Sequence, residues 1–351
     1  MIYKFKENRV WRAYFGGERL DSFAGKKEQV RGRRPEEWIA STVTAFNADR
    51  PQEREGISIC QNGENFAELI EKNPEEMLSK ELSQKFGGKM SILVKLLDAG
   101  ERLVIQCHPT VPFAKKEFGS QFGKTECWYI LDADETANVY LGFKEGITKE
   151  YWKSLFDSQD IKGMLDCLHN HKAKKGDLFF VEGGVPHAIG GGCLMVELQE
   201  PSDLMVIPER KTPSGVELAD IKLHGGLGFE KMWDCFNYDG MSSQEILDKY
   251  YRHIDENKMG IIPVVDQELT ERFSLSLLRF EGEYELSLDG KYAVCVVTDG
   301  EFDLKEGSEV YHFKKSDNFF IPASADKLCF TGKGEIALCF AGNVNNIAEK
   351  P

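Results

Sequence analysis

The chain has 351 residues and a formal net charge of −14, with 41% hydrophobic and 29% charged residues. This balance is typical of a globular protein and excludes a disordered chain, and the length allows two domains of ordinary size. Binding to nucleic acid needs a basic face that releases counterions from phosphates, so this acidic composition predicts no nucleic-acid partner.

Hydrophobic periodicity predicts a few helices among many short strands. Apolar residues at helical spacing predict helices over about 64–88 and 148–171, and the spacing of Ser242 to Glu245 fits a capping box that starts a third helix. Runs rich in β-formers and separated by turn residues predict strands over 91–99, 101–109, 126–134, 137–143, 176–184 and 193–200. After residue 265 the chain is strand-like almost throughout.

Many short strands at regular spacing favour two β-barrels over alternating βα units. We expect an N-terminal domain over residues 1–225 that carries the helical insertions at about 64–88 and 148–171. A helical connection over 226–262 and a C-terminal barrel over 263–351 complete the prediction. Without a long linker or a low-complexity tract in the sequence, the two barrels are expected to pack together.

The N-terminal segment and the cysteines predict a cytoplasmic protein. The first 14 residues contain no apolar core of signal-peptide length, and no segment has the apolar length of a membrane span. Nine cysteines are spread along the chain without a C-x-x-C pair, most of them in apolar surroundings. They are interpreted as buried free thiols in a reducing compartment, away from membranes. The oligomeric state is left open.

Two strand-turn segments concentrate the side chains that bind metals. In the first, Gly100 is followed by Gln106 and His108, which face the same side if the segment is a strand. In the second, a strand after Gly176 runs into a glycine-rich turn that delivers His187. A lone histidine on a strand is more often a core residue than a ligand. Two histidines in two such segments, one of them with a glutamine on the same face, favour a metal site instead.

These segments resemble the paired metal-binding motifs of the cupin superfamily. The first motif is Gly, five residues and His-x-His, here with Gln106 in the place of the first His; the second has Glu182 in the place of a Pro. The resemblance implies a jelly-roll barrel in which these strands face each other and their ligands meet at one metal. It also implies a carboxylate ligand after the first motif, which is Glu126 in this chain, displaced by an inserted segment.

Four blocks in chain order are similar, more narrowly, to the type I mannose-6-phosphate isomerases. They are KLLDAGERLVIQCHPT (95–110), FGKTECWYIL (122–131), GDLFFVEGGVPHAIGGG (176–192) and ELQEPSD (197–203). That family is a zinc-dependent double cupin, and its Gln, His, Glu, His ligand set is matched by Gln106, His108, Glu126 and His187. The resemblance implies a mainly β fold of two jelly-roll barrels with inserted helices, the second barrel free of metal. Such a ligand set suits Zn²⁺ best, with Mn²⁺, Fe²⁺ and Co²⁺ as alternatives.

The resemblance also implies an isomerase of carbohydrate metabolism that interconverts mannose 6-phosphate and fructose 6-phosphate through an enediol. This reaction needs a Lewis acid, a base and a cationic grip on the phosphate. Lys124 would share the face of Glu126 on an extended segment, and we expect it to be catalytic; the alternative is a cation that only neutralises a carboxylate. Lys95, a single charge inside an apolar strand, is expected to bind substrate unless it is structural.

Two positions depart from the family pattern. Val104 stands where the family has a phosphate-binding Ser, and Ile207 stands where it has an Arg that is taken as catalytic. We hypothesise that Arg210, three residues further on, reaches the site and acts in catalysis. The two departures leave open a related cupin that acts on another sugar, or a non-catalytic sugar-binding or regulatory protein.

Overall fold

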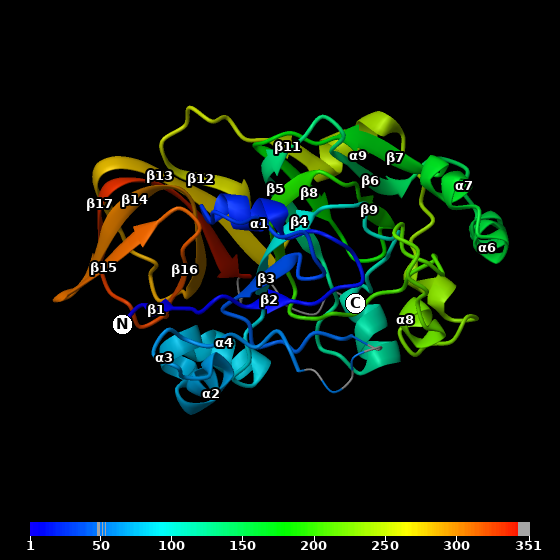
Figure 1. Cartoon of the computed structure of the whole chain (residues 1–351). Helices are drawn as coiled ribbons and strands as arrows, with labels where there is room; N and C mark the ends of the chain where they lie inside the picture. The colour runs from blue at the N-terminus through cyan, green and yellow to red at the C-terminus, as the bar shows by residue number, and fades with distance from the viewer. Residues whose placement is uncertain (48–49, 51, 53, 343–351) are drawn as a thin grey trace.

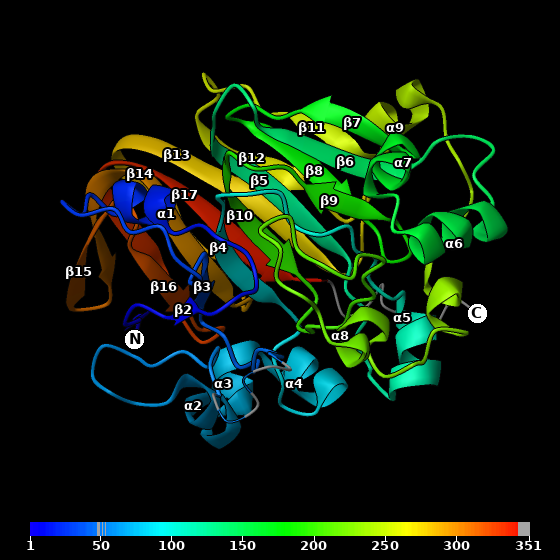
Figure 2. The same ribbon diagram turned by 45° about the vertical axis from the view of Figure 1, so that its right-hand side comes forward.

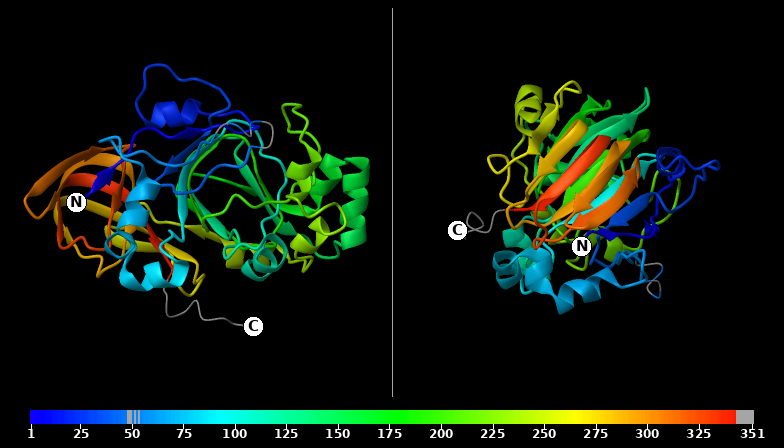
Figure 3. Two further views of the ribbon diagram at one scale, coloured as in Figure 1. Left: turned by 90° about the horizontal axis from the view of Figure 1, so that it is seen from below. Right: turned by 90° about the vertical axis from the view of Figure 1, so that its left-hand side faces the viewer.

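Two antiparallel sheets form the N-terminal barrel of this computed structural model, which describes residues 1–47, 50, 52 and 54–342. Its strands are β2 (Arg9–Val10), β3 (Glu36–Ile39), β4 (Leu93–Ala99), β5 (Glu126–Ala133), β6 (Asn138–Phe143), β7 (Leu168–Lys172), β8 (Asp177–Val181), β9 (His187–Ile189), β10 (Cys193–Gln199) and β11 (Tyr251–His253). One sheet has the order β11-β8-β5-β10-β4-β3-β2, and the other has the order β7-β6-β9. The barrel they enclose is seen along its axis in Figure 3, left.

A third antiparallel sheet forms the C-terminal barrel (Figure 1). Its strands are β1 (Tyr3–Lys4), β12 (Gly260–Val265), β13 (Phe273–Leu286), β14 (Ala293–Glu306), β15 (Glu309–Lys314), β16 (Asn318–Ile321) and β17 (Leu328–Ala341). Strict alternation explains the start of β13, where Phe273, Leu275 and Leu277 are buried and the serines between them are partly exposed. The chain is therefore mainly β, as predicted, and consists of two cupin-type barrels.

Two strands cross the expected domain division. β1 at the N-terminus pairs with β16 of the C-terminal barrel, and β11 from the expected connection pairs with β8 of the N-terminal barrel. The division into domains at residues 225 and 263 stays a prediction. The last nine residues of the predicted C-terminal barrel, 343–351, lie outside the described residues.

The helices are shorter than predicted because local breakers interrupt them. They are α1 (Glu18–Phe23), α2 (Phe66–Lys72), α3 (Pro74–Leu78), α4 (Lys80–Phe86), α5 (Val111–Phe113), α6 (Lys149–Ser158), α7 (Ile161–Asp166), α8 (Asp220–His224) and α9 (Ser243–Tyr250). The expected helix over 64–88 is divided because Pro74 starts a new helix and Ser79 adopts a φ of +81°. The capping box of Ser242 and Glu245 is confirmed.

Two element predictions were wrong in part. Residues 168–172 form strand β7 rather than the end of a helix. The left-handed φ of +51° at Gln159 ends α6, and the short helix α7 that follows ends at Asp166, before β7 begins. Residues 101–109 contribute only isolated bridges, at Gln106 and Cys107, instead of a regular strand. No helix of the described residues is long and apolar enough to cross a membrane.

One hydrophobic cluster continues across the boundary between the two barrels. It runs from the first sheet to one face of the strands of the second barrel, with the rings of Phe180 and Phe273 6.5 Å apart across the boundary, and a separate cluster around Phe302 and Phe313 lies on the other face of those strands. Arg279 of the second barrel also donates to the hydroxyl of Tyr129 at 3.4 Å. Figure 2 shows the barrels side by side, with α6 and α7 at the end of the N-terminal barrel that lies away from its partner.

Candidate metal centre

Backbone pairing brings the predicted ligand positions together from distant parts of the chain. Glu126 is the first residue of β5, between Val181 of β8 and Gln199 of β10. His187 is the first residue of β9 in the facing sheet, and it exchanges two backbone hydrogen bonds of 2.9 Å with Gln106. The two sheets of the barrel thus each contribute one side of the group.

The glycine-rich turn before His187 fits closely against the first motif. The amide of Gly184, whose φ is +89°, donates to the carbonyl oxygen of His108 at 2.7 Å. A Cβ atom at Gly183 would lie 2.7 Å from the carbonyl oxygen of Pro109. Glycine at position 184 accepts the left-handed φ, and glycine at position 183 permits the close approach to Pro109. These two needs explain why the turn has two consecutive glycines.

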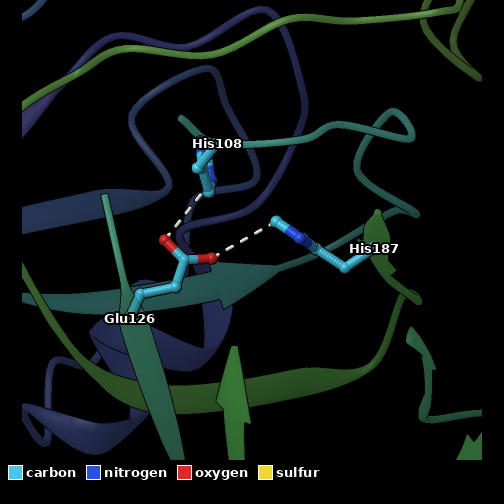
Figure 4. A group of neighbouring side chains, drawn as sticks. All are labelled: His108, Glu126 and His187. Carbon is cyan, nitrogen blue, oxygen red and sulfur yellow. Dashed lines mark ion pairs between the residues drawn. The ribbon is translucent and has the colours of Figure 1, made fainter. Parts of the chain in front are cut away.

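Glu126, His108 and His187 form one compact, fully buried group (Figure 4). The Oε1 atom of Glu126 lies 3.3 Å from Nε2 of His187, and its Oε2 atom lies 3.4 Å from Nε2 of His108. The three ligand atoms are all within 4.8 Å of one another. Among the described residues, this is the one group of three such side chains whose geometry suits a metal ion.

Hydrogen bonds to the backbone orient both imidazoles towards the group. Nδ1 of His108 lies 2.9 Å from the carbonyl oxygen of Leu204, and Nδ1 of His187 lies 2.9 Å from that of Val185. A carbonyl oxygen accepts only, so both Nδ1 atoms carry the proton and both Nε2 atoms present a lone pair. Nε2 of His187 is buried and has no hydrogen-bond partner among the described residues. An orphaned lone pair of this kind fits a metal ligand.

The protonation states also suit metal binding. Burial and the neighbouring charge of Lys124 lower the pKa of His108 to about 4, so its imidazole is neutral at pH 7. Burial alone would raise the pKa of Glu126, but the neighbouring charge of Lys124 holds it well below its usual value. A neutral imidazole and an ionised carboxylate are the forms that bind a divalent cation.

Lys124 lies within the same buried group. Its ammonium pairs with Glu126 and lies 2.7 Å from Nε2 of His108 and 3.8 Å from Glu197. The structure thus places Lys124 on the face of Glu126, as its spacing of two residues predicted. Gln106 is half-buried, and its side chain lines the pocket that Lys124 and Glu126 also line.

A pocket that is partly open to solvent leads to this group, and it combines apolar walls with a few convergent polar groups, as ligand sites do. Its apolar walls include Val104 and Ile207, the two positions that depart from the family pattern. Its charged lining residues are balanced between four cations and four carboxylates: Arg12, Lys95, Lys124 and Lys222 with Glu36, Glu126, Glu197 and Asp203.

A buried charge network forms the floor of the pocket, and Lys95 is its one member that the sequence predicted as a site residue. Arg12 donates to both carboxylate oxygens of Asp203 at 3.2 Å and to Glu36 at 3.0 Å. Lys95 pairs with Glu197 at 3.1 Å and lies 3.8 Å from Glu36. Glu197 and Asp203 belong to the ELQEPSD block (197–203), which was the available signal for them, whereas Arg12 and Glu36 lie outside the four blocks.

The two remaining predicted residues lie in different surroundings. Lys95 lines the pocket, but the residue is only 3% exposed and its ammonium is held by Glu197 and Glu36. Arg210 does not line the pocket: its side chain is 44% exposed, pairs with Asp220 at 3.1 Å and stacks on the rings of Phe156 and Phe229. The geometry therefore does not support the hypothesis of a catalytic Arg210.

The direction of Arg210 follows from its neighbour. Glu209 is buried and accepts from both terminal nitrogens of Arg102, at 2.6 and 2.8 Å, and from the amide of Ile105 at 2.5 Å. The amide of Arg210 then donates to Gln159 after α6. With Glu209 held inward, the Arg210 side chain points away towards the aromatic residues around α6.

Comparisons with known proteins agree with this geometry. The family model "Phosphomannose isomerase type I, catalytic domain" matches residues 52–139, and "Mannose-6-phosphate isomerase, cupin domain" matches residues 267–341. The mannose-6-phosphate isomerase ManA of Bacillus subtilis is 28% identical over 255 residues, which are 71% of this chain and 74% of that protein. The mannose-6-phosphate isomerase of Streptococcus mutans is 26% identical over 288 residues, 80% of this chain and 83% of that protein. A crystal structure of the Bacillus subtilis mannose 6-phosphate isomerase aligns with a TM-score of 0.72 at 25% identity, and covers 96% of this chain and 99% of that one.

Proposed function

The chain belongs to the type I mannose-6-phosphate isomerase family, and we propose that it is a metal-dependent isomerase that interconverts mannose 6-phosphate and fructose 6-phosphate. The observation that carries this proposal is the buried group of His108, Glu126 and His187 at the end of a small-molecule pocket. The free thiols of all nine cysteines are compatible with a reducing compartment, and we place the enzyme in the cytoplasm.

In this proposal Gln106, His108, Glu126 and His187 hold one divalent cation. The two Nε2 lone pairs and the ionised carboxylate converge, and Gln106, whose backbone pairs with that of His187, lines the pocket. Two nitrogen and two oxygen donors suit Zn²⁺ best, and Mn²⁺, Fe²⁺ and Co²⁺ also accept them. When bound, the metal supplies a Lewis acid that stabilises negative charge on the sugar oxygens at C1 and C2.

The pocket residues provide the rest of the chemistry. Moving a proton between C1 and C2 through an enediol needs a group that accepts the proton from one carbon and returns it to the other. Lys124 lies against two proposed ligands inside the pocket. We assign the proton-handling role to its Nζ in the neutral amine form, whose lone pair accepts the proton from one carbon and whose N–H then returns it to the other. The apolar side chains of Leu103, Ile189 and Ile207 on the pocket wall reduce the contact of the site with water, which strengthens the electrostatic contacts in it.

Lys95 is proposed as a substrate-binding residue that acts from a fixed position. Burial works against its charge, but Glu197 and Glu36 raise its pKa, so the ammonium stays protonated. Such a pre-oriented donor contacts a sugar hydroxyl without ordering a flexible side chain on binding.

A coupled assay over a panel of phosphorylated and free hexoses tests the function. We expect mannose 6-phosphate to be converted to fructose 6-phosphate, activity to disappear after treatment with EDTA, and Zn²⁺ to restore it. A zinc-loaded protein that converts no sugar phosphate, or an EDTA-treated protein of full activity, contradicts the proposal.

Matched variants separate metal binding from proton transfer. Glu126→Gln keeps the shape but removes the charge, so we expect both the zinc content per chain and the activity to fall. Lys124→Met should lower kcat by at least about 100-fold, in the range of a lost acid-base group, while the zinc content stays near that of the wild type. A Lys124→Met enzyme of normal kcat contradicts the role of Lys124 and leaves the metal site standing.

A further inference from the structure

The segment that carries Lys124 is buried but irregular. Gly123, Lys124 and Thr125 lie directly before β5 and belong to no helix or strand of the described part of the chain. The amide of Lys124 donates to the carbonyl oxygen of Pro109 at 3.0 Å. Buried N–H groups need an acceptor, and a regular ladder does not supply one to the amides of Gly123 and Thr125. The position of Lys124 therefore depends on what binds these two amides.

The carboxylate of Glu200 binds both of them. One of its oxygens accepts from the amide of Gly123 at 3.3 Å, and the other accepts from the amide of Thr125 at 2.9 Å. The amide of Glu200 also donates to the carbonyl oxygen of Thr125 at 3.0 Å, so these two residues exchange bonds in both directions. Glu200 is 3% exposed and follows directly after the last residue of β10, so it holds the segment from a fixed position in the sheet.

Ser202 holds the same segment from further along the chain. Its buried hydroxyl donates to the carbonyl oxygen of Gly123 at 2.6 Å. The peptide group before Lys124 is thus bound by Ser202 and Pro109, and the peptide group after it is bound by Glu200. Together these bonds fix the direction in which the Lys124 side chain leaves the backbone.

Glu200 supports the pocket without lining it. Lys124 and Glu126 are among the described residues that line the pocket, and Glu200 is not. Glu126 has its own support, because β5 pairs with β8 on one side and β10 on the other. In a reaction that depends on orientation, a misplacement of about 1 Å costs about 100-fold in rate. The contacts of Glu200 therefore bear on the placement of Lys124 more than on the binding of metal or sugar.

We propose that Glu200 is a positioning residue, which holds Nζ of Lys124 in place for proton transfer by binding the backbone amides on both sides of it. The inference rests on the proposed isomerase function, in which Lys124 moves the proton. It assigns to Glu200 an effect on kcat, exerted through the Lys124 side chain. In an enzyme that already lacks the Lys124 amine, loss of Glu200 then has little further effect on the rate.

Glu200→Gln and Glu200→Ala in the zinc-loaded enzyme test the inference. Gln keeps one acceptor oxygen, but its NH₂ group donates and leaves one backbone amide without an acceptor, whereas Ala leaves both without one. We expect kcat with mannose 6-phosphate to fall about 10-fold in Glu200→Gln and about 100-fold in Glu200→Ala. The KM and the zinc content per chain should change less than about threefold, since neither depends on Nζ of Lys124.

Asp98→Ala is the matched control for lost stability. Asp98 is also a buried carboxylate that accepts from two backbone amides, those of Gly17 and Arg19, and it lies outside the lining of the pocket. Both alanine variants leave two buried amides without acceptors, so both should lower the melting temperature. Asp98→Ala should leave kcat within about twofold of the wild type, because no amide beside Lys124 is affected.

The double variant Lys124→Met/Glu200→Gln separates positioning from general damage. Losses from residues that act as a unit in catalysis do not multiply. Glu200→Gln should therefore lower kcat less than about twofold in the Lys124→Met background, compared with about 10-fold in the wild type.

The outcomes distinguish this inference from the proposed function. A wild-type enzyme that converts no sugar phosphate contradicts the function, and a Lys124→Met enzyme of normal kcat removes the side chain through which Glu200 is proposed to act. In an enzyme that passes both tests, an unchanged kcat in Glu200→Ala overturns only the role of Glu200. Losses that multiply fully in the double variant, or an equal fall of kcat in Asp98→Ala, also overturn it, since Glu200 would then act through stability alone.

Discussion

Arg12→Met perturbs the buried network under the pocket by removing the partner of two carboxylates. Arg12 is 6% exposed and makes its hydrogen bonds to Asp203 and Glu36 at 3.0 to 3.2 Å. Removing one partner of a buried ion pair costs about 3–5 kcal/mol, because the remaining charge is left without compensation. Trp38 and Tyr14 still donate to Glu36 at 2.7 Å, so we expect a loss near the lower end, about 3 kcal/mol.

The pH dependence of this loss follows from the two carboxyl groups. Burial would raise their pKa values, but the charges of Arg12 and Lys95 lower the pKa of Glu36 from 4.5 to about 2 and that of Asp203 from 3.8 to about 2. Because the folded pKa values are the lower ones, their contribution to stability is complete above about pH 5 and is lost as the pH falls towards 2. At 1.36 kcal/mol per pKa unit, Glu36 accounts for about 3 kcal/mol and Asp203 for about 2 kcal/mol.

Without Arg12 both carboxyl groups should take up protons at a higher pH in the folded state. The free energy of unfolding lost by Arg12→Met should therefore shrink by at least about 1 kcal/mol between pH 7 and pH 4. Urea unfolding followed by tryptophan fluorescence at both pH values measures it. Arg210→Met is the control, and its exposed pair with Asp220 predicts a change below about 1 kcal/mol. A loss below about 1 kcal/mol at pH 7, or an equal loss at both pH values, would refute the reasoning.

Three further predictions concern the metal centre and its surroundings. Removing the metal with EDTA should lower the melting temperature and Zn²⁺ should restore it, because a ligand that binds only the folded chain stabilises it; identical melting curves would contradict a bound metal. Gly183→Ala should cost about 1–3 kcal/mol and reduce zinc content, since a Cβ there lies 2.7 Å from the carbonyl oxygen of Pro109, and unchanged melting and zinc would argue against that close packing. Arg210→Ala should leave kcat/KM within about threefold of wild type, and a 100-fold loss would return Arg210 to the mechanism.

The sequence alone predicted the fold class from short-range patterns, and it predicted the metal group from motifs that resemble those of a known family. Alternation of apolar residues predicted the strands, and the spacing of Gln106 and His108 placed two ligand types on one segment. The capping box at Ser242 is a local device that acts within one turn, and it formed as predicted. The structure then brought His108, Glu126 and His187 within 4.8 Å of one another.

Only the tertiary structure decided which charges surround that group. Arg12 and Asp203 are 191 residues apart in the chain, and no local pattern relates them. Arg210 points outward because Glu209 is held inward by Arg102, a choice made by packing. Lys222 reaches the pocket because Ile207 bonds to α8. Ion pairs and pocket walls are set by which distant segments lie side by side, and that information exists only in the folded chain.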